Sequence, residues 1–184
     1  MKIGLFFGSF NPVHNGHLAI AEYLNQKKLF DQIWMVVSPN NPLKNREELL
    51  DENERLDMVK LAIKDFPYLS ACDVEFSLPQ PSYTINTLHK LENQYPNFEF
   101  SLILGYDNMD NFHQWKNYEE ILGRFYIYVY PRYKGDFEKK EHPHIVYLDA
   151  TLLPISATEI RSRLKKGESV AEYLPDEVEK YFKR

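Results

Sequence analysis

The fold of this chain is decided by one segment near its start, Phe7-Gly8-Ser9-Phe10-Asn11-Pro12-Val13-His14-Asn15-Gly16-His17. The apolar run Ile3–Phe7 that leads into it predicts a buried strand, and the turn predicts the start of a helix. Such a turn aims backbone N–H groups and the positive end of a helix outward, which favours phosphate binding. His14 and His17 are three residues apart, so they share a face of the first helical turn and can donate to phosphate oxygens without a metal.

Length and composition describe a folded chain of modest size. The 184 residues suffice for a single domain, 1–184, with a full core, and 43% hydrophobic and 15% aromatic residues argue against disorder. The net charge of −5 argues against a general nucleic-acid binder. An anionic substrate therefore has to meet a local cationic patch.

The cysteine and hydropathy patterns predict a cytoplasmic protein. The single cysteine, Cys72, leaves no internal disulfide framework and fits a reducing compartment. We expect it to be a buried structural thiol at the start of the strand-like run 72–77, and not a nucleophile. No Cys/His cluster has the spacing of a zinc site. The N-terminus does not resemble a signal peptide, and no apolar run approaches the length of a membrane span, so no membrane contact is expected.

Apolar, β-branched and aromatic runs recur along the chain at residues 2–7, 33–38, 73–77, 98–105, 125–131 and 145–150. Continuous apolar runs indicate strands buried on both faces of a parallel sheet. Periodicity and capping signals predict helices at 17–29, 51–66 and 84–95, from 117, at 156–166 and from 175, where Pro175 would occupy the first helical position. This alternation predicts an α/β fold, a Rossmann-like, doubly wound, mainly parallel sheet with a small C-terminal helical part. Ligands in such folds bind beyond the carboxyl ends of the strands, where Gly8, the loop after Ser38 and Gly105 all fall.

Two motifs at opposite ends of the chain resemble the signatures of the nucleotidyltransferase superfamily. They are Gly8-Ser9-Phe10-Asn11-Pro12-x-His14-x-Gly16-His17 and Ile155-Ser156-x-Thr158-x-Ile160-Arg161. Three further motifs are similar to those of bacterial nicotinate-nucleotide adenylyltransferases: Pro39-x-x-Pro42-x-Lys44, Ser82-Tyr83-Thr84-Ile85-x-Thr87-Leu88, and Gly105-x-Asp107 followed by Trp115. The resemblance spans essentially the whole chain. It implies transfer of AMP from ATP to nicotinate mononucleotide, which yields deamido-NAD and pyrophosphate in NAD biosynthesis.

The resemblance also implies roles for individual residues. The implied catalytic residues are His14, His17, Lys44 and Arg161. The implied ATP contacts are Gly8, Ser9, Phe10, His14, Gly16, His17, Gly105, Asp107, Ile155, Ser156, Thr158 and Arg161. The implied contacts to nicotinate mononucleotide are Ser82, Tyr83, Thr84, Asp107, Trp115 and Lys44. Mg²⁺ is expected to arrive with the ATP phosphates, so no protein metal ligands are named.

The residue types suit the implied chemistry. A substrate phosphate that is already ionised attacks the α-phosphorus of ATP in line, while negative charge grows on the leaving pyrophosphate. Such a step needs positioning and charge neutralisation more than a general base or a covalent intermediate. Histidines, a lysine and an arginine supply that neutralisation. A helix start at Ser82–Thr84 can receive a nicotinate carboxylate, and an amide in its place would lose the charge-assisted bonds.

The chain departs from the family pattern at four positions. Phe7 replaces a usual glycine and is bulkier where a nucleotide approaches. Ser9 replaces threonine and keeps the hydroxyl. Asn11 replaces aspartate, which removes a negative charge near the expected phosphates, and we expect it to shape the turn. Leu43 replaces a common histidine, so Lys44 carries any charge role in that loop alone.

Structural alternatives stand beside these roles. The histidines and Ser156 could serve only as helix caps, Asp107 could cap a helix, and Trp115 could be a core residue. Arg55 and Arg132 could each reach a phosphate or lie in solvent.

Two other functions stay open at this point. A pantetheine-phosphate adenylyltransferase would share the fold, although the Ser-Tyr-Thr motif and the Asp107 and Trp115 pair argue for a pyridine carboxylate. A regulator that binds a nucleotide without turnover is the second alternative, against which His14, His17, Lys44 and Arg161 argue. The sequence is compatible with a homo-oligomer and does not decide the oligomeric state.

Overall fold

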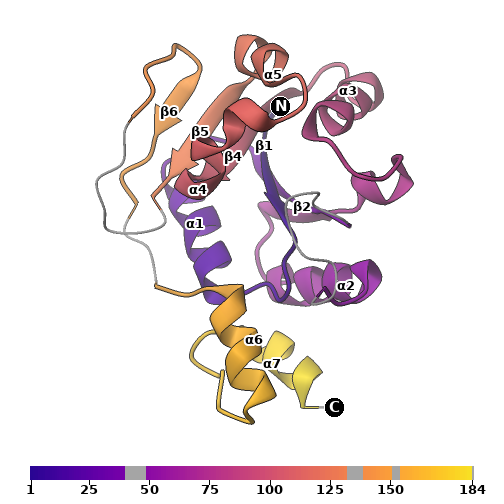
Figure 1. Ribbon diagram of the computed structural model, residues 1–184, viewed down its shortest axis with the longest axis vertical. Coiled ribbons are helices and arrows are strands. Elements are labelled where there is room, and N and C mark those ends of the chain that lie inside the picture. Colours follow the sequence, from indigo (N-terminus) through magenta and orange to yellow (C-terminus); the bar gives the residue numbers. More distant parts are fainter. Residues whose placement is uncertain (40–48, 132–138, 151–153, 184) are drawn as a thin grey trace.

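A computed structural model describes residues 1–39, 49–131, 139–150 and 154–183. Within these residues six strands form one sheet in the order β3-β2-β1-β4-β5-β6. The strands are β1 (Lys2–Gly8), β2 (Gln32–Val37), β3 (Leu69–Cys72), β4 (Glu99–Gly105), β5 (Tyr126–Tyr130) and β6 (Ile145–Tyr147). Every neighbouring pair is parallel (Figure 1). The strand order reverses between β1 and β4, which places a ligand crevice at their carboxyl ends.

Helices connect and cover the strands. They are α1 (Asn15–Gln26), α2 (Glu52–Ile63), α3 (Thr84–Gln94), α4 (Tyr106–Asp110), α5 (Tyr118–Arg124), α6 (Ala157–Lys165) and α7 (Asp176–Phe182), with the 3₁₀ turns η2 (Val74–Ser77) and η3 (Phe112–Gln114). The Asp51 carboxylate accepts a hydrogen bond from the Asn53 backbone N–H at 2.9 Å, which caps the start of α2. The Ser156 hydroxyl accepts from the Glu159 N–H at 3.2 Å and caps α6 in the same way.

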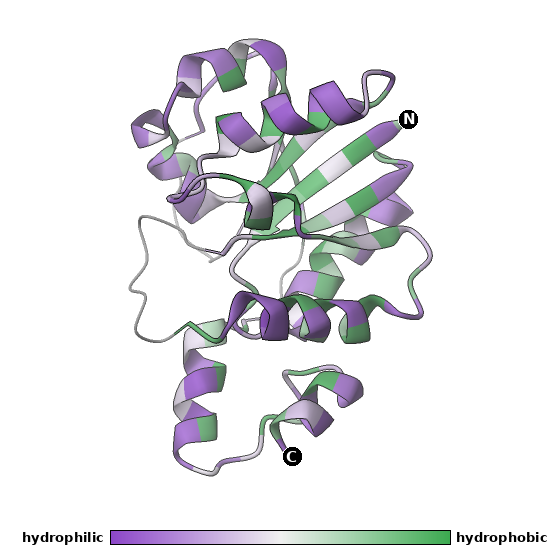
Figure 2. Ribbon diagram, turned by 90° about the vertical axis from the view of Figure 1, so that its right-hand side faces the viewer, coloured by the Kyte–Doolittle hydropathy of each residue, from purple (hydrophilic) through white to green (hydrophobic). Residues whose placement is uncertain are grey.

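The sheet has an apolar core on each face. In β1, Ile3 and Leu5 pack on the face that α3 and α5 cover, whereas Phe6 packs on the face that α1 and α2 cover. Successive side chains of a strand point to opposite faces, so a strand buried on both sides has to be apolar throughout. Figure 2 shows this arrangement, with hydrophobic colour concentrated along the strands and hydrophilic colour on the outer parts of the helices. The predicted doubly wound α/β fold is confirmed.

The structure corrects the boundaries of the third and sixth predicted strands. The run 73–77 is not a strand, because Val74–Ser77 form the 3₁₀ turn η2, and β3 ends at Cys72 just before it. An apolar run alone does not distinguish a short strand from a buried turn. The sixth strand is also shorter than expected and ends at Tyr147.

Cys72 is half-buried and is the last residue of β3, whereas the sequence predicted a buried thiol that begins a strand. Burial raises the pKa of the Cys72 thiol to about 11, so it is protonated at neutral pH and a poor nucleophile, as expected.

The C-terminal helices α6 and α7 lie together beyond the sheet (Figure 1). The Asn15 backbone N–H at the start of α1 donates to the Tyr173 carbonyl at 2.9 Å, and Lys64 after α2 pairs with Glu177 of α7 at 3.1 Å. Pro175 is the N-cap residue of α7, so the helix begins at Asp176, one residue later than predicted. The chain's end is thereby brought to the edge of the sheet where β1 gives way to α1. No helix among the described residues is both long and apolar enough to cross a membrane.

Candidate active site

The turn after β1 is tightly packed. Phe10 adopts a positive φ of 44° and is 2% exposed, and its ring lies under Gly8, where a Cβ atom would come within 2.8 Å of it. A side chain at Gly8 would therefore displace the buried ring. Asn11 is 3% exposed, and its side-chain oxygen accepts a hydrogen bond from the Leu50 N–H at 3.2 Å. The Asn11 side chain thus ties the turn to the segment that precedes α2.

The two histidines of the first motif form a stacked pair at the start of α1. His14 is the N-cap residue and His17 lies three positions on, with ring centroids 3.7 Å apart. The His14 backbone N–H donates to Nδ1 of His17 at 3.2 Å. Because Nδ1 accepts, the neutral His17 ring carries its proton on Nε2, which makes Nε2 a hydrogen-bond donor.

Neighbouring groups hold this pair in place. The His17 ring meets the Phe10 ring at a centroid distance of 5.0 Å and the Phe6 ring at 5.8 Å, both edge to face. A Cβ atom on Gly16 would lie 3.0 Å from the His14 ring and 3.7 Å from the Cβ atom of Ile155. Gly16 thus leaves room for the histidines and brings Ile155 of the second motif against the first.

Arg161 connects the two motifs directly. Its Nη1 donates to the Asn11 carbonyl at 3.0 Å across 150 residues of sequence, and its Nη2 donates to the Thr158 hydroxyl at 3.4 Å. The guanidinium therefore lies beside the turn after β1, and Ser156 is the N-cap residue of the helix that carries Arg161. Motifs from the two ends of the chain meet in one place, at the carboxyl edge of β1.

Arg55 has a third role that neither sequence interpretation named. It is 1% exposed and donates to the carbonyls of Ser9 at 2.6 Å, Ser38 at 2.8 Å, Leu50 at 3.0 Å and Pro39 at 3.2 Å. Burial lowers the pKa of the Arg55 guanidinium, with nearby carboxylates opposing the shift. Arg55 is thus an internal brace for the segments after β1 and β2, neither solvated nor directed at a phosphate. Arg132 lies outside the described residues.

The Gly105 turn lies next to the Gly8 turn, since β4 and β1 are neighbours in the sheet. A Cβ atom on Gly105 would come within 2.6 Å of the Asp107 carboxylate and 3.2 Å of the Tyr130 ring. Asp107 is exposed in the first turn of α4. Gly105 thus permits the Asp107 carboxylate to reach the carboxyl edge of the sheet.

Three of the residues expected to contact the second nucleotide, Ser82, Tyr83 and Thr84, lie at the start of α3. Ser82 is buried, with its hydroxyl 3.3 Å from the Gln80 side-chain oxygen, and Tyr83 is the N-cap residue before Thr84. Trp115 is half-buried beside Phe112, with ring centroids 5.3 Å apart.

Lys116, the residue after Trp115, reaches back to this helix start. Its Nζ lies 4.7 Å from the centre of the Tyr83 ring, a cation–π contact. Among the described residues, no carboxylate pairs with the Lys116 ammonium. The contact brings the Trp115 segment and the start of α3 together and adds a positive charge there. Lys44 and Leu43 lie outside the described residues.

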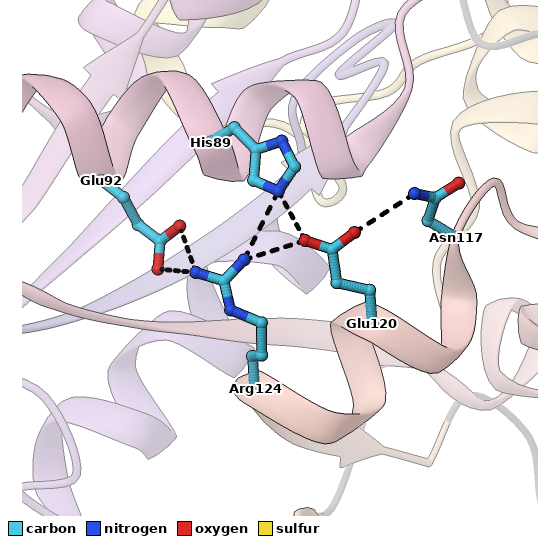
Figure 3. Close-up of polar contacts among 5 residues, drawn as sticks. All are labelled: His89, Glu92, Asn117, Glu120 and Arg124. Carbon is cyan, nitrogen blue, oxygen red and sulfur yellow. Dashed lines mark hydrogen bonds and ion pairs between the residues drawn. The ribbon is translucent and has the colours of Figure 1, made fainter.

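A polar network holds α3 and α5 together on the outside of this region (Figure 3). Arg124 pairs with Glu92 at 2.9 Å and with Glu120 at 2.9 Å, and His89 lies 2.6 Å from Glu120. The hydrogen bond with His89 and a further one from Asn117 lower the pKa of the Glu120 carboxyl to about 2. The network fixes the helix that follows Trp115 relative to the helix that follows Tyr83.

Comparison with known proteins identifies the family. Residues 5–163 match the cytidylyltransferase-like family. The chain belongs to this family. Within it the chain groups with nicotinate-nucleotide adenylyltransferases, and the resemblance of its motifs is confirmed. A probable nicotinate-nucleotide adenylyltransferase of Flavobacterium johnsoniae is 50% identical over 99% of this chain and 96% of its own. One of Cytophaga hutchinsonii is 48% identical over 97% of this chain and 94% of its own.

Solved structures in the same group confirm the fold. A putative nicotinate-nucleotide adenylyltransferase from Vibrio parahaemolyticus has a TM-score of 0.76 at 24% identity, and covers 100% of this chain and 99% of its own. A Plasmodium falciparum nicotinic acid mononucleotide adenylyltransferase complexed with NaAD has a TM-score of 0.81 at 20% identity, and covers 98% of this chain and 93% of its own.

Three residues outside the motifs contact residues of the candidate site. Lys116 follows Trp115 directly and could have been noted as a neighbouring charge. Arg55 and Glu75 are polar residues in apolar surroundings, and a charged residue within a helix or strand pattern does not reveal its burial. Glu75 is 2% exposed and lies behind α3.

Proposed function

We propose that this cytidylyltransferase-like protein transfers AMP from ATP to nicotinate mononucleotide and releases deamido-NAD and pyrophosphate. The observation that carries the proposal is the meeting of the two motifs, where Arg161 donates to the Asn11 carbonyl at 3.0 Å beside the stacked histidines. The full-length similarity to proteins named nicotinate-nucleotide adenylyltransferase supports the choice of substrates.

The phosphate end of the site consists of the turn after β1, α1 and the start of α6. Nε2 of His17 donates to the α-phosphate as charge grows on the leaving pyrophosphate, and His14 supports it. Arg161 and the N-terminal N–H groups of α6 receive the β- and γ-phosphates. The attacking phosphate is already ionised, so the reaction needs no general base and forms no covalent intermediate. Lys44, in the segment after Pro39, adds a further cation.

The nicotinate end of the site lies between the start of α3 and Trp115. The ring of nicotinate packs on Trp115, and its carboxylate meets the N–H groups and the hydroxyl at Thr84. The Lys116 ammonium, held over Tyr83, strengthens the preference for an acid over an amide. Asp107 accepts hydrogen bonds from ribose hydroxyls at the neighbouring strand end.

The remaining assignments follow from this chemistry. Mg²⁺ enters with ATP as part of the substrate, because the side chains at the phosphate end are hydrogen-bond donors that suit phosphate oxygens and do not suit a cation. Residues 1–184 act as one nucleotidyltransferase domain in the cytoplasm, where the lone cysteine stays reduced. Gel filtration and light scattering would measure whether it works as a homo-oligomer.

Pyrophosphate release provides the decisive test. The protein is incubated with ATP and Mg²⁺ and, in parallel, nicotinate mononucleotide, nicotinamide mononucleotide or phosphopantetheine. We expect strong turnover with the nicotinate form, weak turnover with the amide and none with phosphopantetheine. Preferred turnover of phosphopantetheine would replace the proposal with the other adenylyltransferase. Binding of ATP without turnover of any of the three would make the protein a nucleotide sensor.

A further inference from the structure

Glu75 is a buried acid that the reaction does not use. It lies in η2 and is 2% exposed. One carboxylate oxygen, Oε1, accepts a hydrogen bond from the Thr87 hydroxyl at 2.8 Å. The other, Oε2, is buried and has no hydrogen-bond partner among the residues that the structure describes. Burial raises the pKa of the Glu75 carboxyl, and the hydrogen bond from the Thr87 side chain opposes that rise.

Such a residue is costly for the fold. A carboxyl group in an apolar interior loses its hydration, and an unsatisfied oxygen adds to the loss. An apolar residue of similar size would commonly be tolerated as well or better. The hydrogen bond that Glu75 makes to α3 is therefore the feature to explain.

That bond joins two elements at the carboxyl edge of the sheet. Glu75 lies in η2, which follows β3 directly, and β3 pairs with β2 through Cys72 and Val36. Thr87 lies in the first turn of α3, where its N–H donates to the Tyr83 carbonyl at 3.3 Å. Glu75 thus joins the carboxyl end of β3 to the helix start that is proposed to receive the second nucleotide.

We propose that Glu75 is a positioning residue for the acceptor nucleotide, which holds the first turn of α3 against the carboxyl end of β3 through Thr87. This inference rests on the proposed function. When Glu75 is removed, the Thr87 hydroxyl keeps only a long contact of 3.5 Å to the Tyr83 carbonyl, and the start of α3 loosens. Small misplacements of binding groups lower reaction rates strongly, by up to about 100-fold for about 1 Å.

The test compares KM values for the two substrates. We expect Glu75→Ala to raise the KM for nicotinate mononucleotide about tenfold or more and to change the KM for ATP less than about twofold. Glu75→Gln keeps the shape and an oxygen acceptor for Thr87, so it should restore both values to within about threefold. Thr87→Val removes the donor at equal volume and should raise the same KM as Glu75→Ala.

A matched control separates this role from stability alone. Val59 is fully buried on the opposite face of the sheet, so Val59→Ala should lower the melting temperature and leave both KM values unchanged below it. If Glu75→Ala and Thr87→Val behave like Val59→Ala, Glu75 is only structural and the proposal is wrong. Equal increases in both KM values would overturn it too.

Hydrogen exchange gives a readout that does not depend on the substrate. In Glu75→Ala, backbone amides of residues 84–88 should exchange at least about tenfold faster, with no change in α1. Faster exchange together with no turnover of nicotinate mononucleotide by the unaltered protein would reject the proposed function and keep the positioning of α3. Unchanged exchange would reject the positioning itself, whatever the protein turns over.

Discussion

Arg55→Met should be among the most damaging substitutions in this chain. The methionine has a similar length and no donors, so the carbonyls of Ser9, Ser38, Leu50 and Pro39 all lose their hydrogen bonds to Arg55. The contacts to Ser9 and Pro39 are buried, so those two carbonyls stay dry, whereas the other two are partly accessible and regain water. At about 1–3 kcal/mol for each dry unsatisfied carbonyl, the loss of unfolding free energy is roughly 4 kcal/mol.

Urea denaturation followed by fluorescence measures this loss. A change of about 4 kcal/mol corresponds to a melting temperature lower by roughly 8–16 °C for a chain of this size. For Arg55→Lys we expect a loss of unfolding free energy smaller than that of Arg55→Met but still measurable. A single ammonium keeps some of the hydrogen bonds and cannot reach carbonyls in four directions. Lys60→Met, an exposed position on the same helix, should change the unfolding free energy by less than about 0.5 kcal/mol. A loss below about 1 kcal/mol for Arg55→Met would refute the reasoning, because the carbonyls would then have found other partners.

Three more perturbations address the site and its support. His17→Ala should lower kcat for pyrophosphate release by roughly 10²–10³-fold with little change in melting temperature, as one donor to the developing charge is lost; a loss below tenfold would place that role elsewhere. Lys116→Ala should raise the KM for nicotinate mononucleotide roughly tenfold but hardly that for the amide form, with Lys60→Ala as the control. Equal effects on both forms would contradict a contact to the carboxylate. Because the folded pKa of Glu120 is lowered from 4.5 to about 2, its network stabilises the fold fully above pH 4.5 and loses that contribution as the pH falls toward 2. Glu120→Gln should flatten this part of the curve of stability against pH, and an unchanged curve would show that the network contributes nothing.

The sequence alone predicted the architecture and the family. Continuous apolar runs show which segments are strands buried on both faces, since any polar residue there would face a core. The motifs around His14 and Arg161 carry the family resemblance because phosphate chemistry limits the residue types and spacings that can serve it. These are local constraints, so a single sequence expresses them. The third strand was misplaced, since the apolar run at Val74 fits a buried 3₁₀ turn as well as a strand.

Only the tertiary structure decided what the polar residues away from the motifs do. The sequence left Arg55 open between a phosphate ligand and a surface residue, and the fold made it a brace for four carbonyls. It also brought Lys116 to Tyr83 and buried Glu75 behind α3, and it joined the two motifs themselves through Arg161 and Asn11. The paired residues lie far apart along the chain, or their contact depends on side-chain direction, so local periodicity does not reveal these pairs. They arise because a parallel sheet gathers the carboxyl ends of all its strands at one edge, and the segments that follow must satisfy their polar groups there.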